Sequence, residues 1–95
     1  MSKSEDNKSR ITVEIHNRPY TIVGNEQPHR VRMVASLVDQ KMHEIHEANN
    51  RLDTTKLAVL TAVNTMNDYI ELKEQFNELL DYLDKLEEKE RGKND

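Results

Sequence analysis

The 95-residue sequence contains no cysteine, no tryptophan, two glycines and two prolines. Without cysteine, the chain has neither a disulfide framework nor thiol chemistry. Few glycines and prolines interrupt regular structure, and a composition of 34% charged and 35% hydrophobic residues favours long helices. No apolar stretch approaches the roughly 18 residues of a membrane span, and the first ten residues do not resemble a signal peptide. We therefore expect a soluble cytoplasmic protein without a membrane partner.

Recognisable catalytic constellations are also lacking. The sequence has no glycine-rich phosphate loop and no serine, histidine and aspartate set on typical turns. The segment "HEIHE" places His43, His46 and Glu47 on one helix face, within reach of one metal ion. A zinc-protease motif needs two histidines four residues apart, so we interpret this segment as a solvated helix face. We expect no enzymatic activity, no cofactor and no metal, and we expect His16 and His29 to be isolated and exposed.

What the sequence does contain begins with the segment "VEIHNRPYTIVG", which predicts a β-hairpin. Apolar and polar residues alternate over residues 11–15, the period of a half-buried strand. A two-residue turn at Asn17 and Arg18 puts the apolar residues of both strands on one face, and asparagine tolerates the positive φ of such a turn. A lone hairpin is marginal in water, so other elements must cover it. The pairs expected from this register are Ile15 with Tyr20 and Val13 with Ile22.

From about Glu26 the period lengthens to that of an amphipathic helix. Pro28 lies in its first turn, where the missing N–H costs little. Met33 and Leu37 fall outside the apolar stripe and widen the apolar surface beyond what a hairpin needs. The stripe itself consists of Val31, Val34, Ala35, Val38, Met42 and Ile45.

A longer helix is predicted over residues 54–90. Asp53 is a natural N-cap, and Leu52 and Leu57 occupy the positions of a hydrophobic staple. No glycine or proline follows until Gly92, so this helix would be roughly 55 Å long at 1.5 Å per residue.

The two halves of this long helix differ in pattern. Over residues 57–70 apolar side chains surround most of the helix, as expected inside a core. From Tyr69 onward they narrow to a heptad seam with steps of three and four. Leu80 and Tyr82 flank the seam, which indicates that more than two helices pack together. The residues expected to mediate oligomerisation are Tyr69, Leu72, Phe76, Leu79, Leu83 and Leu86, with Leu80 beside them.

Together these elements predict a mainly α fold with a small N-terminal β-hairpin, in which an α+β head continues into an oligomeric coiled coil. We expect a disordered tail over residues 1–9, a globular head over residues 10–68, and a coiled-coil stalk with a C-terminal tail over residues 69–95. Because the apolar surface exceeds what one chain can bury, the chain should be an obligate oligomer.

Charge is spread unevenly along the chain. The net charge of −4 divides into +2 over residues 1–35 and −6 over the remainder, which suggests different roles for the two ends. One candidate role is nucleic-acid binding by a basic-headed oligomer, since β-ribbons can read DNA grooves. Acidic residues offset four of the six cations in the basic part, a poor footprint for phosphates. We therefore keep nucleic-acid binding as the alternative and expect no nucleic-acid partner.

Several segments resemble one known family. The hairpin "VEIHNRPYTI", the helix "VRMVASLVDQKMHEI", the segment "TTKLAVLTAVNTMNDYIEL" and the closing coiled coil occur in the order seen in ZapA, the Z-ring-associated family of bacterial cell-division proteins. The resemblance covers roughly residues 10–90. It implies a cytoplasmic protein at midcell that binds FtsZ, the tubulin-like GTPase of the division ring, and cross-links or bundles its filaments. It also implies homodimers whose long helices join into an antiparallel homotetramer.

The resemblance further implies a binding surface. In the family, the charged head surface that includes the hairpin turn is implicated in binding FtsZ, and Arg18 matches the turn arginine. Further cations of the next helix extend this surface on grounds of charge and expected exposure. The FtsZ-binding candidates are Arg18, Arg30, Arg32 and Lys41.

Overall fold

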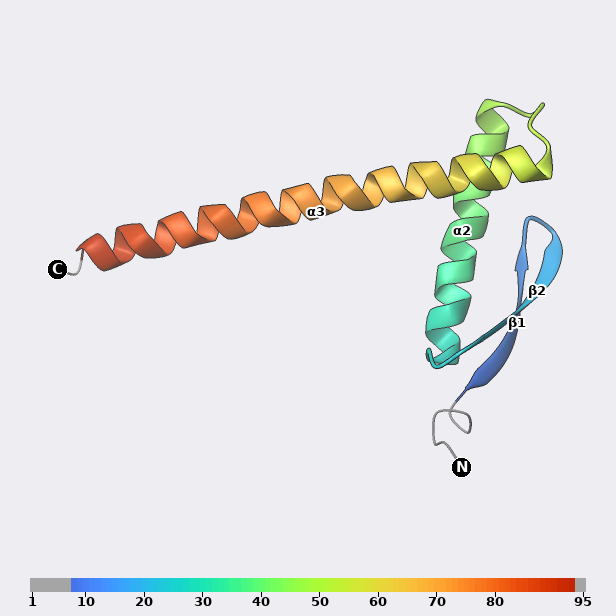
Figure 1. The fold of residues 1–95 in the computed structure, drawn as a ribbon, viewed down its shortest axis with the longest axis horizontal. Coiled ribbons are helices and arrows are strands. Elements are labelled where there is room, and N and C mark those ends of the chain that lie inside the picture. The colour runs from blue at the N-terminus through green and yellow to red at the C-terminus, as the bar shows by residue number, and fades with distance from the viewer. Residues whose placement is uncertain (1–7, 94–95) are drawn as a thin grey trace. The chain divides into compact units, whose positions relative to one another are not determined.

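A computed structural model describes residues 8–93 of the chain and has the predicted order of elements (Figure 1). The fold class is confirmed, because the chain is mainly helical, with a two-stranded antiparallel hairpin before two helices. The elements are β1 (Ser9–Ile15), β2 (Arg18–Gly24), α2 (Pro28–Ala48) and α3 (Thr54–Lys93).

Contacts within the chain divide it into two compact units, Met1–Thr61 and Ala62–Asp95. The first unit contains the hairpin, α2 and the first turns of α3, and the second contains the rest of α3. The expected division between head and stalk at residue 68 stays a prediction, because it depends on a partner that a single chain lacks.

The hairpin turn lies at His16 and Asn17, so the predicted position was wrong by one residue. Both residues have positive φ, 52° and 62°, as a type I′ turn requires. Ile15 and Arg18 flank this turn, and the N–H of the fourth turn residue is the usual donor across it. In the predicted turn that donor would have been Pro19, which has no N–H. The observed pairs are Val13 with Tyr20 and Ile11 with Ile22.

This correction shifts the strand pairing by two residues and therefore leaves every side chain on its predicted face. It also makes Arg18 the first residue of β2 rather than the tip of the turn. β1 begins at Ser9, whose hydroxyl donates to the carbonyl oxygen of Glu26 at 3.2 Å. The tail predicted over residues 1–9 is thus wrong for Ser9, and residues 1–7 lie outside the described part of the chain.

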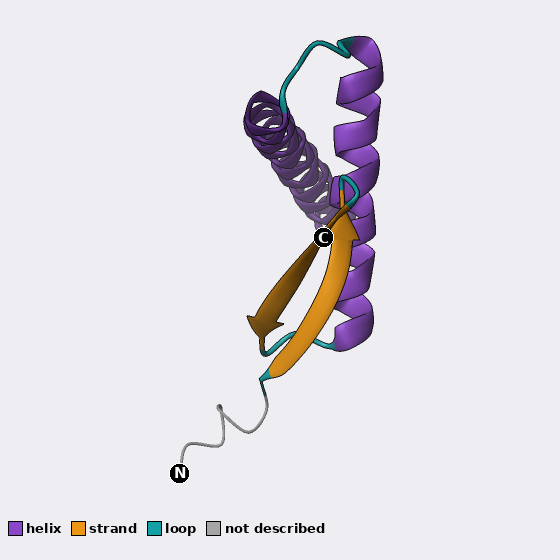
Figure 2. Ribbon diagram, turned by 90° about the vertical axis from the view of Figure 1, so that its right-hand side faces the viewer, coloured by secondary structure: helices purple, strands orange, loops and turns teal. Residues whose placement is uncertain are grey.

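The hairpin packs on α2 through β1 (Figure 2). Val13 of β1 forms the core cluster with Val31 and Ala35, which lie one turn apart on α2, and Ile11 and Ile15 are partly buried against it. Alternate residues of β1 share one face of the ribbon, and this packing buries that face of β1 against α2. The hairpin is therefore covered by α2, as the sequence required.

β2 is much less covered than β1. Tyr20 and Ile22 face the same side of the ribbon as the core residues of β1, yet they are 46% and 37% exposed. On α2, Val34 of the predicted stripe is also exposed, as are Met33 and Leu37 outside it. One chain therefore leaves part of its own apolar interior uncovered.

The start of α3 follows the sequence closely. The Oδ1 atom of Asp53 accepts a hydrogen bond from the backbone N–H of Lys56 at 2.8 Å, which confirms the predicted N-cap. Leu57 is fully buried and Thr61 is buried, and the Thr61 hydroxyl donates to the carbonyl oxygen of Leu57 at 2.7 Å. These first turns of α3 are part of the interior of the first unit, together with the buried Met42 of α2.

For the rest of residues 57–70, the expectation of a buried segment was wrong for the single chain. Apolar side chains occur on several sides of the helix there, but only the face that carries Leu57 and Thr61 is covered. The exposed apolar residues of this stretch are Val59, Leu60, Val63, Met66, Tyr69 and Ile70.

Candidate interaction surfaces

Arg18 is the predicted candidate cation that lies on the hairpin. As the first residue of β2 it is paired with Ile15 across the turn, and it is exposed. It forms no ion pair with another described residue. Its guanidinium, with five donors in a planar fork, is thus available to an anionic group on another molecule.

The three predicted cations of α2 differ in their surroundings. Arg30 is exposed, and its Nε atom lies 3.8 Å from Oε2 of Glu26, a solvated pair of little energetic weight. Arg32 is exposed and has no ion-pair partner among the described residues. Lys41 is half-buried and has an interaction partner, so it is less exposed than predicted. Arg18 and Arg32 are therefore the two available cations of the predicted set.

Arg32 borders a hollow between β1 and α2. The volume of the hollow is about 310 Å³. Arg32 and Asp39 line it from α2, two turns apart, and Glu14 lines it from β1. Charges of both signs therefore meet at this hollow. Its full lining is Thr12, Val13, Glu14, Arg32, Ala35, Ser36 and Asp39.

The fold ties the hairpin turn to α2 by contacts that sequence reasoning missed. The backbone N–H of His16 donates to Oδ1 of Asp39 at 2.7 Å, and the rings of His16 and His46 lie edge to face with centroids 5.9 Å apart. The expectation that His16 is isolated and exposed was therefore wrong. These contacts place the turn before Arg18 at Asp39, and Asp39 also lines the hollow that Arg32 borders.

Among the described residues, the "HEIHE" segment has one ring contact outside itself, between His46 and His16. His43 Nε2 lies 3.1 Å from Glu47 Oε1, and both side chains are about 70% exposed. Across residues 8–93 no group of three histidine, cysteine or acidic side chains is arranged to hold a metal ion. An exposed pair such as His43 with Glu47 is typical of a solvated helix face.

The second surface is the apolar seam of α3, the residues predicted to mediate oligomerisation. All its members are exposed, by 42% for Leu86 to 65% for Leu72. A monomer rarely exposes so large a contiguous apolar patch without an interaction partner. The apolar seam comprises Tyr69, Leu72, Phe76, Leu79, Leu83 and Leu86, flanked by Leu80.

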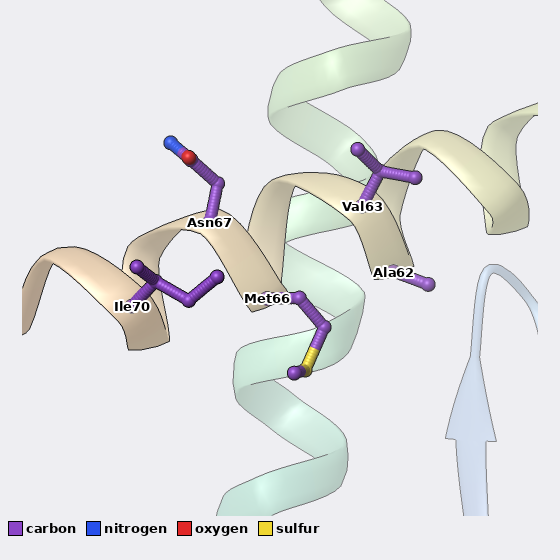
Figure 3. A pocket seen from close by; sticks show the side chains of 5 residues that line it. All are labelled: Ala62, Val63, Met66, Asn67 and Ile70. Atoms are coloured by element: carbon purple, nitrogen blue, oxygen red, sulfur yellow. The ribbon is translucent and has the colours of Figure 1, made fainter. Parts of the chain in front are cut away.

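An apolar hollow continues the seam toward the N-terminal part of α3. Figure 3 shows five side chains projecting from successive turns of the helix, and they line a volume of about 430 Å³. Four are apolar and the fifth, Asn67, donates from its side-chain amide to Glu71 at 3.4 Å. The lining residues are Ala62, Val63, Met66, Asn67 and Ile70. Within residues 8–93, no helix has the length and apolar character that a membrane span needs.

Comparisons with known proteins agree with this combination of surfaces. The family model described as "Cell division protein ZapA" matches residues 11–92. This chain belongs to the ZapA family. A cell division protein ZapA of Oceanobacillus iheyensis is 60% identical over 85 residues, covering 90% of this chain and 99% of that protein. One from a Geobacillus species is 54% identical over 82 residues, covering 86% and 94%.

A solved structure supports the same assignment. It is described as a ZapA mutant dimer from Geobacillus stearothermophilus, with 49% identity, a TM-score of 0.62, and coverage of 80% of this chain and 88% of that one. The family supports a role in cell division and is not known as a family of enzymes. The dimeric relative supports self-association of this chain.

Proposed function

We propose that the chain binds FtsZ and cross-links its filaments, and so stabilises the Z-ring at midcell. The observation that carries this proposal is the division of α3 between two kinds of surface. Its first turns are buried in a unit that presents Arg18 and Arg32, and its later turns carry an exposed apolar seam. A cross-linker needs both a binding surface and an assembly surface, and they lie on different units here.

Assembly into a homotetramer follows from the apolar surfaces. The heptad spacing of the apolar seam is that of helices that pack side by side, and Leu80 and Tyr82 widen it beyond the need of two strands. The exposed apolar residues of β2 and of residues 59–70 provide a further surface, on which two copies first pair. In this proposal the dimer completes the interior of each first unit, and the apolar seam joins two dimers.

Cross-linking then arises from the number of binding surfaces and their separation. α3 has 40 residues, about 60 Å at 1.5 Å per residue, and a coiled coil of that length is a stiff connector. After one surface has bound a filament, further contacts become intramolecular, so weak single contacts combine into strong overall binding. The gain in overall binding is greatest for a partner with repeated binding sites, such as a filament.

Purified FtsZ with GTP provides the test. We expect the unaltered chain to co-sediment with FtsZ filaments and to raise their light scattering by bundling. Leu83→Glu should still co-sediment with FtsZ, because Leu83 lies in the second unit, but it should not bundle filaments, because assembly beyond the dimer is lost. Bundling by a variant that sedimentation equilibrium shows to be dimeric would contradict the cross-linking mechanism.

The nucleic-acid alternative has less support. Of the four candidate cations, Arg30 faces Glu26 and Lys41 is half-buried with a partner, which leaves a small footprint for phosphates. A gel shift with duplex DNA at two salt concentrations serves as the parallel measurement. Tight binding with steep salt dependence, together with no binding to FtsZ, would favour the alternative.

A further inference from the structure

The hairpin turn is held on α2 by a three-residue contact that we call the turn clasp, made of His16, Asp39 and His46. The His16 backbone N–H donates to Oδ1 of Asp39 at 2.7 Å. The imidazole rings of His16 and His46 meet at 63° with centroids 5.9 Å apart. Asp39 is exposed, and both histidines are half-buried. The clasp is thus a surface feature, separate from the apolar core around Val13.

The turn itself needs such support. His16 and Asn17 both have positive φ, a conformation that is uncommon for residues other than glycine, although asparagine, aspartate and histidine adopt it more often than the rest. Strained backbone persists where its surroundings hold it in place. A hydrogen bond from an amide to a carboxylate is short and strong, and it acts at His16, the less tolerant of the two turn residues.

The clasp is connected to both available cations of the predicted set. Arg18 follows the turn directly and is paired with Ile15, so its direction depends on where His16 is held. Arg32 lines the same hollow as Asp39. A displaced turn would therefore move Arg18 relative to Arg32. Among the described residues, neither arginine side chain forms a hydrogen bond or ion pair with a residue of the clasp.

We propose that Asp39 and His46 are positioning residues, which hold the hairpin turn in the orientation in which Arg18 and Arg32 together meet an acidic surface of the partner. This inference rests on the proposed binding of FtsZ. It predicts a change in affinity opposite to the change that simple charge attraction would produce. Removal of the Asp39 carboxylate makes this face more basic, yet it should weaken binding to an acidic partner, because the turn is released.

The test compares full-length variants for binding to FtsZ filaments. Asp39→Ala should weaken the affinity by about tenfold, the scale of one charge-assisted hydrogen bond. Asp39→Asn keeps a side-chain carbonyl as acceptor and should retain most of the affinity. Glu44→Ala is the matched control, because it removes the same charge from an exposed position of α2 outside the clasp. His46→Ala should weaken binding less than Asp39→Ala does. It provides the substitute test if Asp39→Ala is poorly folded.

Two further readouts separate positioning from a general loss of structure. In an amide NMR spectrum, Asp39→Ala should shift the His16 resonance and speed its hydrogen exchange, while the amides around Val31 stay unchanged. In a double-mutant cycle, Asp39→Ala should cost little affinity once Arg18→Ala is present, since coupled residues are not additive. A purely structural role would give additive losses.

Each outcome decides the proposal. Equal affinity of the unaltered chain and Asp39→Ala, with the His16 amide released, would overturn it. Equal weakening by Asp39→Ala and Asp39→Asn would also overturn it, because the charge rather than the acceptor would then matter. If the unaltered chain itself fails to bind FtsZ, both this inference and the proposed function fall, and that control distinguishes the two failures.

Discussion

The two ends of α3 differ sharply in burial although both are rich in apolar residues. Leu57 is fully buried in the first unit, whereas Val63, less than two turns further along the helix, is 61% exposed. The apolar seam beyond it is exposed throughout. The difference does not lie in residue type. It lies in which face of the helix is covered, because Leu57 and Thr61 are buried within the first unit and the residues after Thr61 are exposed.

This contrast shows that the chain has two separate sources of stability. The interior of the first unit is built by local contacts of one chain, around Val13, Val31 and Ala35. The exposed face of α3 gains nothing in a single chain, and in the proposed assembly a second copy removes its apolar surface from water. Stability of the first kind is independent of protein concentration, whereas stability of the second kind follows mass action.

The largest effect is expected when a charge enters the apolar seam. Leu79→Glu or Leu83→Glu should split tetramers into folded dimers. An unpaired charge buried between helices costs several kcal/mol, which lowers an association constant by about a thousandfold or more. Sedimentation equilibrium at micromolar concentration measures the mass. Asn77→Glu adds the same side chain outside the seam and should leave the mass unchanged, and unchanged mass for both seam variants would contradict the assignment of the seam.

The next effect concerns the buried end of the helix. Leu57→Ala should lower the free energy of unfolding by about 2–5 kcal/mol, because it leaves a cavity in a packed interior. Urea denaturation at several protein concentrations measures this loss, which should persist at every concentration. Leu60→Ala removes the same atoms from a position of the same helix that is exposed in the single chain and lies on the proposed dimer surface, so its effect should depend on protein concentration. If the two variants lose equal stability at all concentrations, the contrast between the covered and uncovered faces is wrong.

Much of this fold could be predicted from the sequence because it follows from periodicity and local chemistry. Alternation gave β1, the three-and-four spacing gave α2 with Val31 and Ala35 in its core, and Asp53 marked the start of α3. These signals are local, since each depends on residues within a few positions. The same periodicity could not say which chain covers residues 57–70, because the apolar pattern is alike for an internal core and for an interface.

The errors in the hairpin have a different origin. A two-residue shift of register preserves the faces of both strands, so the hydrophobic pattern could not distinguish the predicted turn from the observed one. The missing N–H of Pro19 could have distinguished the two turns. The predicted turn needs this N–H as its donor, whereas the observed turn does not. The bond between His16 and Asp39 joins residues 23 positions apart, and no spacing rule reveals such a contact before the hairpin is docked on α2.

A smaller effect is expected at the junction between α2 and α3. Asp53→Ala should cost about 1 kcal/mol, because it removes the acceptor of the Lys56 N–H at the start of α3. Asp53→Ser retains a capping oxygen and should restore most of that loss. Thermal or urea unfolding of the two variants measures the difference. Equal stability of Asp53→Ala and the unaltered chain would show that packing around Leu57 alone fixes the start of the helix.

The smallest effect on stability is expected at Arg18, where the effect on function should be large. Arg18 is exposed and has no ion-pair partner among the described residues, so Arg18→Glu should change the free energy of unfolding by no more than about 0.5 kcal/mol. Its co-sedimentation with FtsZ filaments should nevertheless fall, because a negative charge would replace the cation that is proposed to meet an acidic surface of the partner. Circular dichroism and sedimentation equilibrium would establish that the helices and the mass are unchanged.

Arg30→Glu is the matched control for this reversal. It makes the same charge change in the same unit, but Arg30 already faces Glu26 and is not one of the two cations assigned to the binding surface in the proposal. It should therefore reduce co-sedimentation less than Arg18→Glu. Equal losses for the two variants would indicate that only the net charge of the first unit matters. Undiminished co-sedimentation of Arg18→Glu would exclude the hairpin turn from the binding surface, and the search would move to the β2 face that carries Tyr20 and Ile22.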